Sequence, residues 1–282
     1  MIHLLLIVYA LSCIIPLLGI LSLSVTANTT LVYEGFKLIP KKISFAAYRI
    51  IFKSPMLILD SYKISIIVTA IGTFLSMIVT SGVAYAISRH DFSLRKKISF
   101  FLYFTMLFNG GLVPWYILIS RYLHLLDTIW ALIIPYLVSP WFVLVLRAFM
   151  QKIPMEIIES CYTDGANEYR IFWQFVLPLS KPGLATVALF TVFRYWNDWW
   201  LGLLFLVNPS LAPLQLVLYR VLSGAQIMSQ LPGMISRIPI QDLPTMAMQM
   251  GLAVLAAGPI LIVFPFFQKY FVRGLTLGSL KG

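Results

Sequence analysis

EIIESCYTDGANEYRIFWQFVLPLSKP, residues 156–182, is a polar segment between two long apolar runs. Its position indicates how the rest of the chain is arranged. It holds four of the chain's ten acidic residues, so in a membrane protein it must be an aqueous loop. Pro154 suits the first turn of a short helix, where its missing N–H is not needed. Glu156 and Glu159 would then lie at the positive end of the helix dipole. The loop is therefore expected to open with a helix.

A break and a second helix are expected to follow. Asp164-Gly165 predicts the end of the first helix, since Gly165 can adopt the positive φ that strains any residue with a Cβ. The Asp164 carboxylate is expected to cap the next helix, and Pro178 and Pro182 are expected to end it. This second helix carries an apolar stripe at i, i+3, i+4 and i+7: Tyr169, Phe172, Trp173 and Val176. An apolar stripe on a segment surrounded by water predicts a protein partner.

The loop resembles the cytoplasmic EAA loop of ABC importer permeases. The residues that stand at the family's spacing are Glu159, Asp164-Gly165-Ala166, Phe172, Leu177-Pro178-Leu179 and Pro182. Ser160 and Cys161 replace the two alanines that follow the glutamate, which keeps small side chains on the docking face. The resemblance implies that the segment from Glu159 to Leu177 is a coupling helix that docks into a groove on an ATP-hydrolysing subunit. The alternative is an ordinary amphipathic helix lying on the membrane surface.

The resemblance covers nearly the whole chain after the first external loop. The cluster from Trp196 to Asp198 and the closing PFFQKYFVRGLTLGSLKG, residues 265–282, are similar to the carbohydrate-importing branch of the family. The resemblance therefore implies an all-α permease of the ABC importer type I class. The residues expected to couple it to the ATPase are Glu156, Glu159, Ser160, Cys161, Asp164, Gly165, Ala166, Tyr169 and Phe172.

Composition independently indicates a polytopic membrane protein. Hydrophobic residues make up 60% of the chain, charged residues 11%, and the mean hydropathy is +0.90. A soluble domain carries about 25% charged residues. The chain is expected to form one transmembrane domain, residues 1–282, with the coupling loop at 151–182. Six segments are long and apolar enough to be membrane-spanning helices: about 2–24, 61–88, 98–119, 128–149, 183–207 and 244–267.

The short basic loops predict the orientation. Arg89, Arg95, Lys96 and Lys97 lie on the same predicted side as the glutamate-rich loop and the tail at Lys269, and such charges favour the cytoplasm. Both termini are then expected to be cytoplasmic, in a cell membrane. The segments 25–60 and 208–243 become large external loops that could contact a binding protein.

Two predicted helices contain features of a helix interface or a cavity. The second segment has a continuous face of small residues for close helix packing, although some of its hydroxyls could face a substrate path: Ser65, Thr69, Gly72, Ser76 and Thr80. In the third segment, Asn109-Gly110-Gly111 followed by Pro114 interrupts the helix at membrane depth. Such a break is tolerated only where protein or a wet cavity satisfies the backbone. Asn109 is therefore a candidate for the substrate path.

The fifth segment holds a polar cluster, residues 194–200, in the middle of an apolar helix. Arg194 and Asp198 are four apart, so on one helix they would share a face and could neutralise each other. Sugar hydroxyls need donors and acceptors, and sugar C–H faces stack on aromatic rings. Arg194, Asn197 and Asp198 are the main candidates for the path, followed by Trp196 or Trp200. A purely structural ion pair is the alternative, and a free arginine would also suit an acidic sugar.

The sequence supports other functional classes less well. The net charge of +11 is scattered over loops on both sides of a membrane, which does not indicate nucleic-acid binding. His3, His90 and His124 lie in different segments, and no metal site is predicted. No catalytic residues of an intramembrane enzyme are found either. An ion-coupled secondary transporter is the main alternative to an importer permease.

The resemblance implies a complex around this subunit. The chain itself has no phosphate-binding glycine loop with lysine, so no cofactor is expected in it, and ATP and Mg²⁺ would be bound by two separate ABC ATPase subunits. The other implied partners are a second homologous permease, an extracytoplasmic sugar-binding protein and membrane lipid. The cargo would be a sugar or oligosaccharide, moved into the cytoplasm by alternating access.

Overall fold

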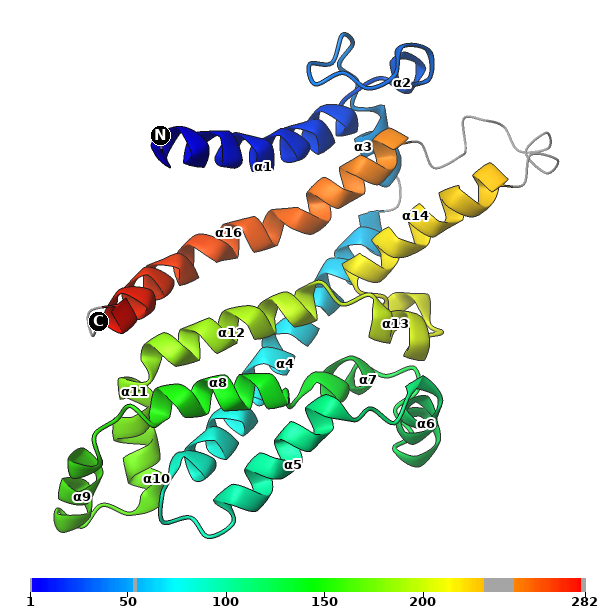
Figure 1. Ribbon diagram of the computed structural model, residues 1–282. Helices are drawn as coiled ribbons and strands as arrows, with labels where there is room; N and C mark the ends of the chain where they lie inside the picture. The colour runs from blue at the N-terminus through cyan, green and yellow to red at the C-terminus, as the bar shows by residue number, and fades with distance from the viewer. Residues whose placement is uncertain (1, 53–54, 231–245, 280–282) are drawn as a thin grey trace. The chain divides into compact units, whose positions relative to one another are not determined.

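The computed structural model describes residues 2–52, 55–230 and 246–279 (Figure 1). Within these ranges every regular element is helical, apart from one antiparallel bridge between Thr26 and Ile43. The all-α prediction is therefore confirmed. The chain divides into two compact units, Met1–Ile64 with Pro209–Leu261 and Ser65–Asn208 with Ile262–Gly282.

The first unit contains helices from both ends of the chain. Its elements are α1 (Ile2–Ser24), α2 (Asn28–Glu34), α3 (Ala46–Ile51), α14 (Leu214–Gln230), the 3-10 turn η4 (Pro209–Leu211) and the first parts of α4 (Pro55–Ser88) and α16 (Met246–Ser279). Its core joins Ile51, Ile58 and Leu252, with Tyr62 packed against them. The Tyr62 hydroxyl donates to the Leu255 carbonyl at 2.6 Å, which ties α4 to α16 within this unit.

Two segments expected to be external loops contain helices. Residues 25–60 include α2, α3 and the start of α4, which begins six residues before the predicted boundary. Residues 208–243 include α14, in which Leu214 and Val217 are buried and Leu218 and Val221 pack on the core. These four positions are spaced i, i+3, i+4 and i+7, which is the spacing of one apolar face of a helix. The predicted external loop 208–243 has three charged residues. Arg220 lies in α14, whereas Arg237 and Asp242 lie outside the described residues.

The second unit contains the rest of α4 and the middle of the chain. Its elements are α5 (Arg95–Leu107), α6 (Leu112–Ile117), the π-helix η1 (Leu118–Tyr122), α7 (Trp130–Ile133), the 3-10 helix η2 (Ile134–Tyr136), α8 (Pro140–Met150), α9 (Met155–Thr163), α10 (Glu168–Ile171), the π-helix η3 (Phe172–Val176), α11 (Leu177–Leu179), α12 (Lys181–Trp196) and α13 (Trp200–Phe205). Its core holds Ile87, Val143, Leu146, Ile171 and Val187, each at most 1% exposed.

Three predicted spans are broken rather than straight. The segment 98–119 splits into α5 and α6–η1, which meet at 115°, and 128–149 splits into α7–η2 and α8, which meet at 51°. The segment 183–207 splits at residues 197–199 into α12 and α13. Among the described residues, α1 and α4 are single helices long and apolar enough to cross a membrane, and up to five spans result if each bent pair counts as one. Six spans remain a prediction.

Local chemistry explains the first break. Gly111 has a φ of 87°, in the left-handed region that favours glycine, and the Asn109 side-chain oxygen accepts a hydrogen bond from the Gly111 N–H at 2.9 Å. The predicted interruption at Asn109-Gly110-Gly111 is confirmed.

The small-residue face of α4 is a packing surface. Ser65, Thr69, Ser76 and Thr80 are buried, and a Cβ built on Gly72 would lie 2.6 Å from the Tyr195 ring. Tyr195 cannot easily move away, because it is 3% exposed and its hydroxyl donates to the Ile133 carbonyl at 3.0 Å. The absent side chain at Gly72 therefore allows α4 and α12 to approach closely.

We expect Gly72→Ala to destabilise the protein, because overpacking a close contact costs about 1–3 kcal/mol. Gly82→Ala is the matched control, since a Cβ there meets nothing within 4 Å, and alanine favours a helix interior over glycine by about 1 kcal/mol. Thermal unfolding in detergent should give a lower midpoint for Gly72→Ala and an equal or higher one for Gly82→Ala. Equal midpoints for the two variants would contradict this packing.

Candidate functional site: coupling loop and membrane pocket

The first helix of the loop, α9, presents one face outward and one to the core. Glu156 lies in its first turn, as predicted, but Pro154 is the N-cap residue just before the helix rather than part of its first turn. Glu159 and Ser160 are exposed, whereas Ile158 and Cys161 are buried. The expectation that Cys161 lies on a docking face is wrong for this reason: its side chain is 4% exposed and packs in the core of the second unit.

The turn after α9 is built as a helix C-terminus with a left-handed residue. Gly165 has a φ of 77°, which confirms the predicted positive φ. The Gly165 N–H donates to the Tyr162 carbonyl and the Ala166 N–H to the Cys161 carbonyl, both at 2.9 Å, which satisfies carbonyls at the helix end. Ala166 then faces the core, at 7% exposed, so its expected place on the docking face is wrong for the same reason as that of Cys161. Gly165 and Asp164 are exposed.

The predicted cap of the next helix is wrong by three residues. Asp164 is the C-terminal cap of α9, and Asn167 caps α10, because its side-chain oxygen accepts a hydrogen bond from the Arg170 N–H at 2.9 Å. Asn and Asp are about equal as caps, so their distance from the helix start decides between them. Asn167 directly precedes Glu168, the first residue of α10.

The apolar stripe of the second helix is divided between the surface and the core. Tyr169 is 79% exposed and Trp173 is 56% exposed, whereas Val176 is buried. Phe172 is half-buried against the Tyr85 ring, with 5.2 Å between ring centroids. Two aromatic side chains are therefore left on the outer surface of the loop, as a docking segment requires.

Pro178 does not end the second helix as expected. The helical run continues from Glu168 to Leu179 and meets α12 at 82°, with the break at Ser180. The π-helical turn η3 precedes Pro178, which lies in the first turn of α11, where its missing N–H is tolerated.

A pocket of about 320 Å³ lies in the second unit where the spans break. Its lining combines polar and aromatic groups: Asn109, Gly111, Leu112, Trp115, Tyr136 and Trp200. Asn109 and Trp200 were predicted for the substrate path, and the structure brings them together. A helix rises about 1.5 Å per residue, so the 13 residues of α5 place its break about 20 Å from the basic end of that helix. A hydrocarbon core is about 30 Å thick, so this length is shorter than a full membrane crossing.

Tyr136 organises the charged groups beside this pocket. Its hydroxyl donates to the Asp198 carboxylate at 2.9 Å, and the Arg194 guanidinium lies 4.0 Å from the centre of its ring. The ring quadrupole attracts the cation. Tyr136 therefore contacts the guanidinium with the face of its ring and the carboxylate with its hydroxyl. This role of Tyr136 could hardly be predicted, since it is a single aromatic residue in an apolar run.

The helix pairing predicted for Arg194 and Asp198 is wrong. Helix α12 ends at Trp196, so Asp198 lies beyond it and instead accepts a hydrogen bond from the Leu201 N–H of α13 at 3.2 Å. Within the described chain, no ion pair of 4.0 Å or less joins these two residues. The structure therefore does not support a simple intrahelical ion pair.

The other predicted path residues differ in access. Trp196 is 7% exposed and belongs to the packing of the unit, so it is not at the pocket surface. Asn197 is exposed and its side-chain amide donates to the Phe193 carbonyl at 3.0 Å. Trp200 is 39% exposed and lines the pocket.

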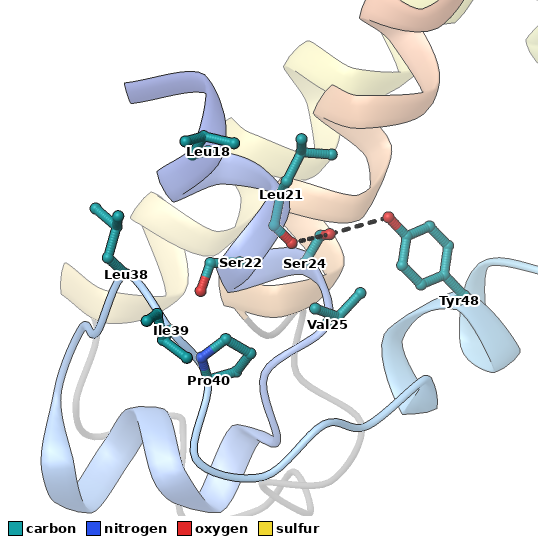
Figure 2. Close-up of a pocket in the computed structure, with 9 residues that line it drawn as sticks. All are labelled: Leu18, Leu21, Ser22, Ser24, Val25, Leu38, Ile39, Pro40 and Tyr48. Carbon is teal, nitrogen blue, oxygen red and sulfur yellow. Dashed lines mark hydrogen bonds between the residues drawn. The ribbon is translucent and has the colours of Figure 1, made fainter. Parts of the chain in front are cut away.

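A wider pocket of about 460 Å³ lies in the first unit, between α1 and the segment that follows it (Figure 2). Its walls are mostly apolar, including Leu18, Leu38 and Ile39. The Ser22 and Ser24 hydroxyls already donate to backbone carbonyls, and Tyr48 donates to Ser24 at 3.0 Å. This pocket offers few free polar groups to a sugar, so the pocket at Tyr136 is the better candidate. In the parts of the chain that the structure describes, no three His, Cys, Asp or Glu side chains are grouped to hold a metal ion.

Comparison with known proteins agrees with this architecture. Residues 71–277 match the family described as binding-protein-dependent transport system inner membrane component. The polygalacturonan/rhamnogalacturonan transport system permease protein YtcP of Bacillus subtilis is 38% identical over 280 residues, which cover 98% of this chain and 96% of that protein. The arabinooligosaccharides transport system permease protein AraQ of Halalkalibacterium halodurans is 29% identical over 95% of this chain and 91% of its own length.

A solved structure shows the same fold. The crystal structure of a bacterial ABC transporter involved in the import of the acidic polysaccharide alginate contains a chain that superposes with a TM-score of 0.81 and 28% identity, covering 95% of this chain and 94% of that one. The protein described here belongs to the binding-protein-dependent transport system inner membrane component family, as a membrane permease component of an ABC importer and not an enzyme.

Proposed function

We propose that this chain is one of two permease subunits of an importer that carries an acidic oligosaccharide into the cytoplasm. The observation that carries the proposal is the Arg194 guanidinium, held on the Tyr136 ring beside the pocket and not neutralised by a direct ion pair with Asp198. Such a cation can bind a sugar carboxylate with paired hydrogen bonds. The names of YtcP and of the alginate importer support the same class of cargo, since polygalacturonan and alginate are both acidic polysaccharides.

The pocket suits a sugar in its other groups too. The Asn109 side chain provides hydrogen-bonding groups, and the rings of Trp115 and Trp200 provide faces for stacking. The Asp198 carboxylate lies behind Tyr136 and accepts the hydrogen bond of its hydroxyl. Asn197, one residue past the end of α12, is exposed and is kept as a candidate for the path beyond the pocket.

The coupling loop is proposed as the contact with the ATPase. Its outward groups are Glu156, Glu159 and Ser160 on α9 and Tyr169 and Trp173 after the turn. Its inward groups fix the loop to the core of the unit: Cys161, Ala166 and, in part, Phe172. ATP and Mg²⁺ would be bound by the two ATPase subunits, whose closure would move the docked loops and open the membrane helices alternately to the two sides. A second permease, an external sugar-binding protein and membrane lipid complete the assembly.

The proposed topology has six spans and cytoplasmic termini, with Arg95, Ile157 and Lys281 on one side. We expect single cysteines at these positions, in a chain whose Cys13 and Cys161 are replaced by serine, to resist an impermeant thiol reagent added outside intact cells. They should react after the cells are permeabilised. A cysteine at Phe36, between α2 and α3, is the control and should react from outside. Labelling of position 157 in intact cells would refute this topology.

The complex and its cargo can be tested together. A tagged copy of the chain, purified from native membranes, should retain two ATPase subunits and a second permease. The external binding protein encoded for this complex should then bind trigalacturonate more tightly than the neutral trisaccharide maltotriose. Recovery of the complex with a preference for maltotriose would keep the importer and refute the acidic cargo.

A further inference from the structure

One buried arginine lies where α4 meets the coupling loop. Arg89 directly follows the last residue of α4 and is 6% exposed. Its Nε and Nη2 atoms donate to the two Asp91 carboxylate oxygens at 3.1 and 2.7 Å. This fork lowers the pKa of the Asp91 carboxyl below its usual range, chiefly through the hydrogen bonds from Arg89. The guanidinium is thereby fixed in one orientation.

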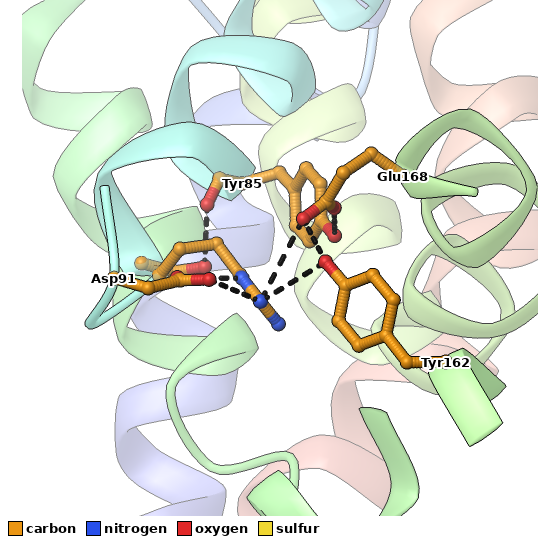
Figure 3. Close-up of polar contacts among 6 residues, drawn as sticks. Tyr85, Asp91, Tyr162 and Glu168 are labelled. Atoms are coloured by element: carbon orange, nitrogen blue, oxygen red, sulfur yellow. Dashed lines mark hydrogen bonds and ion pairs between the residues drawn. The ribbon is translucent and has the colours of Figure 1, made fainter. Parts of the chain in front are cut away.

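The same guanidinium reaches both sides of the Gly165 turn (Figure 3). Its Nη2 atom donates to the Tyr162 hydroxyl at 3.2 Å, on α9 before the turn. It also lies 3.6 Å from the Glu168 carboxylate, on α10 after the turn. One side chain at the end of α4 thus contacts both helices of the coupling loop.

Two tyrosines complete this cluster. The Tyr85 hydroxyl, from the last turn of α4, and the Tyr162 hydroxyl each donate to the Glu168 carboxylate. Burial, followed by this hydrogen bond, raises the pKa of Tyr162 to about 12. The Tyr162 hydroxyl therefore stays protonated, and can donate its hydrogen bond, at physiological pH.

Stability alone does not account for a cation in this place. The Arg89 Nη1 atom is buried and has no hydrogen-bond partner among the described residues, which is unfavourable. Replacing buried ionic groups by apolar ones of similar volume is often neutral or stabilising, whereas ionic groups can fix one arrangement of the elements they join.

We propose that Arg89 is a positioning residue that links movement of the coupling loop to α4. The proposal rests on the proposed contact of the loop with an ATPase. A displacement of α9 would act through Tyr162 on Arg89, and a displacement of α10 through Glu168 on both Arg89 and Tyr85. The connection is polar and directional, so it holds α9 and α10 at a fixed angle against the end of α4. The apolar contacts of the core could slide where these bonds cannot.

The test measures hydrogen exchange in the complete purified complex, with and without trapping of its ATPase subunits by ATP and orthovanadate. No sugar is needed, so the identity of the cargo does not affect the result. In the natural protein, trapping should change exchange in residues 155–163 of α9 and also in residues 76–88 of α4. In Arg89→Ala the change in α9 should remain, and the change in α4 should fall at least about fivefold, at the low end of typical couplings between sites.

Controls separate positioning from simple loss of a charge. Arg95→Ala removes a nearby arginine, the first residue of α5, which contacts His90, and should keep both changes. Arg89→Lys keeps the charge without the fork and should give an intermediate value. If Arg89→Ala does not assemble, the double variant Tyr162→Phe/Glu168→Ala removes the loop side of the cluster and should give the same loss in α4.

Three results would overturn the proposal. They are an unchanged α4 response in Arg89→Ala, an unchanged response in the double variant, or no α4 response in the natural complex. A chain that carries no ATPase subunits would instead refute the proposed function, so the two failures are distinguishable.

Discussion

Gly165→Val is expected to abolish transport while the chain still inserts into the membrane and pairs with its partner permease. The Gly165 φ of 77° is strained for a residue with a Cβ, and most of all for a β-branched one. Strain of this kind costs about 1–3 kcal/mol. The loop would spend most of its time in other conformations, and its apparent affinity for the ATPase would fall in proportion, by about 5- to 150-fold.

A clash within this chain cannot account for the effect, because a Cβ at Gly165 meets none of its atoms within 4 Å. Gly165→Asn is therefore the matched control, since asparagine tolerates the left-handed region better than valine. It should retain most transport. The measurements are uptake by cells and the amount of ATPase subunit that copurifies with the tagged chain. Equal ATPase recovery with both variants would show that this turn does not control docking.

Arg194→Leu is expected to remove most uptake of an acidic oligosaccharide while the complex still assembles. A hydrogen bond to a charged group contributes about 1.5–3 kcal/mol, so losing it should reduce uptake of trigalacturonate about 10- to 150-fold. The coupling loop is untouched, so stimulation of ATPase activity by the loaded binding protein should persist. Arg194→Lys should lie between the two, because it keeps the charge but not the planar fork.

The control for this variant is Arg220→Leu, which removes an exposed arginine of α14 in the first unit, whereas Arg194 contacts the pocket residue Tyr136 in the second unit. Uptake and stimulated ATPase activity are measured together in proteoliposomes. Normal uptake by Arg194→Leu would reduce the arginine to a structural partner of Tyr136. A parallel loss of uptake and ATPase activity would also count against a path role.

The coupling loop could be predicted closely because its signals are local. The conformation of Gly165, the start of α9 after Pro154 and the exposure of Glu159 follow from the chemistry of a few neighbouring residues. The errors were of a different kind. Periodicity predicts which residues share a face of the helix, but the burial of Cys161 depends on which face the core covers. Asp164 and Asn167 lie three residues apart and are both good capping residues, so residue type alone could not decide between them.

The pocket was predicted only in part, because it depends on where separate helices break. Hydropathy favours long unbroken spans, so it placed Arg194 and Asp198 on one helix that in fact ends at Trp196. The role of Tyr136 requires the ends of η2 and α12 to meet, which no single segment reveals. Arg89 likewise counted only as a charge that sets topology, because its partners on the coupling loop lie more than 70 residues away along the chain.

Uptake by the purified complex in proteoliposomes is the most direct test of an ATP-driven importer of acidic oligosaccharides. The liposomes contain the two permeases and the ATPase subunits, with the binding protein on the opposite side of the membrane from ATP. We expect ATP-dependent accumulation of labelled trigalacturonate at a rate at least about tenfold above that of maltotriose. This is the preference given by a difference of about 1.4 kcal/mol between the binding free energies of the two sugars. Accumulation of trigalacturonate driven by a sodium or proton gradient without ATP, or a preference for maltotriose, would contradict this expectation.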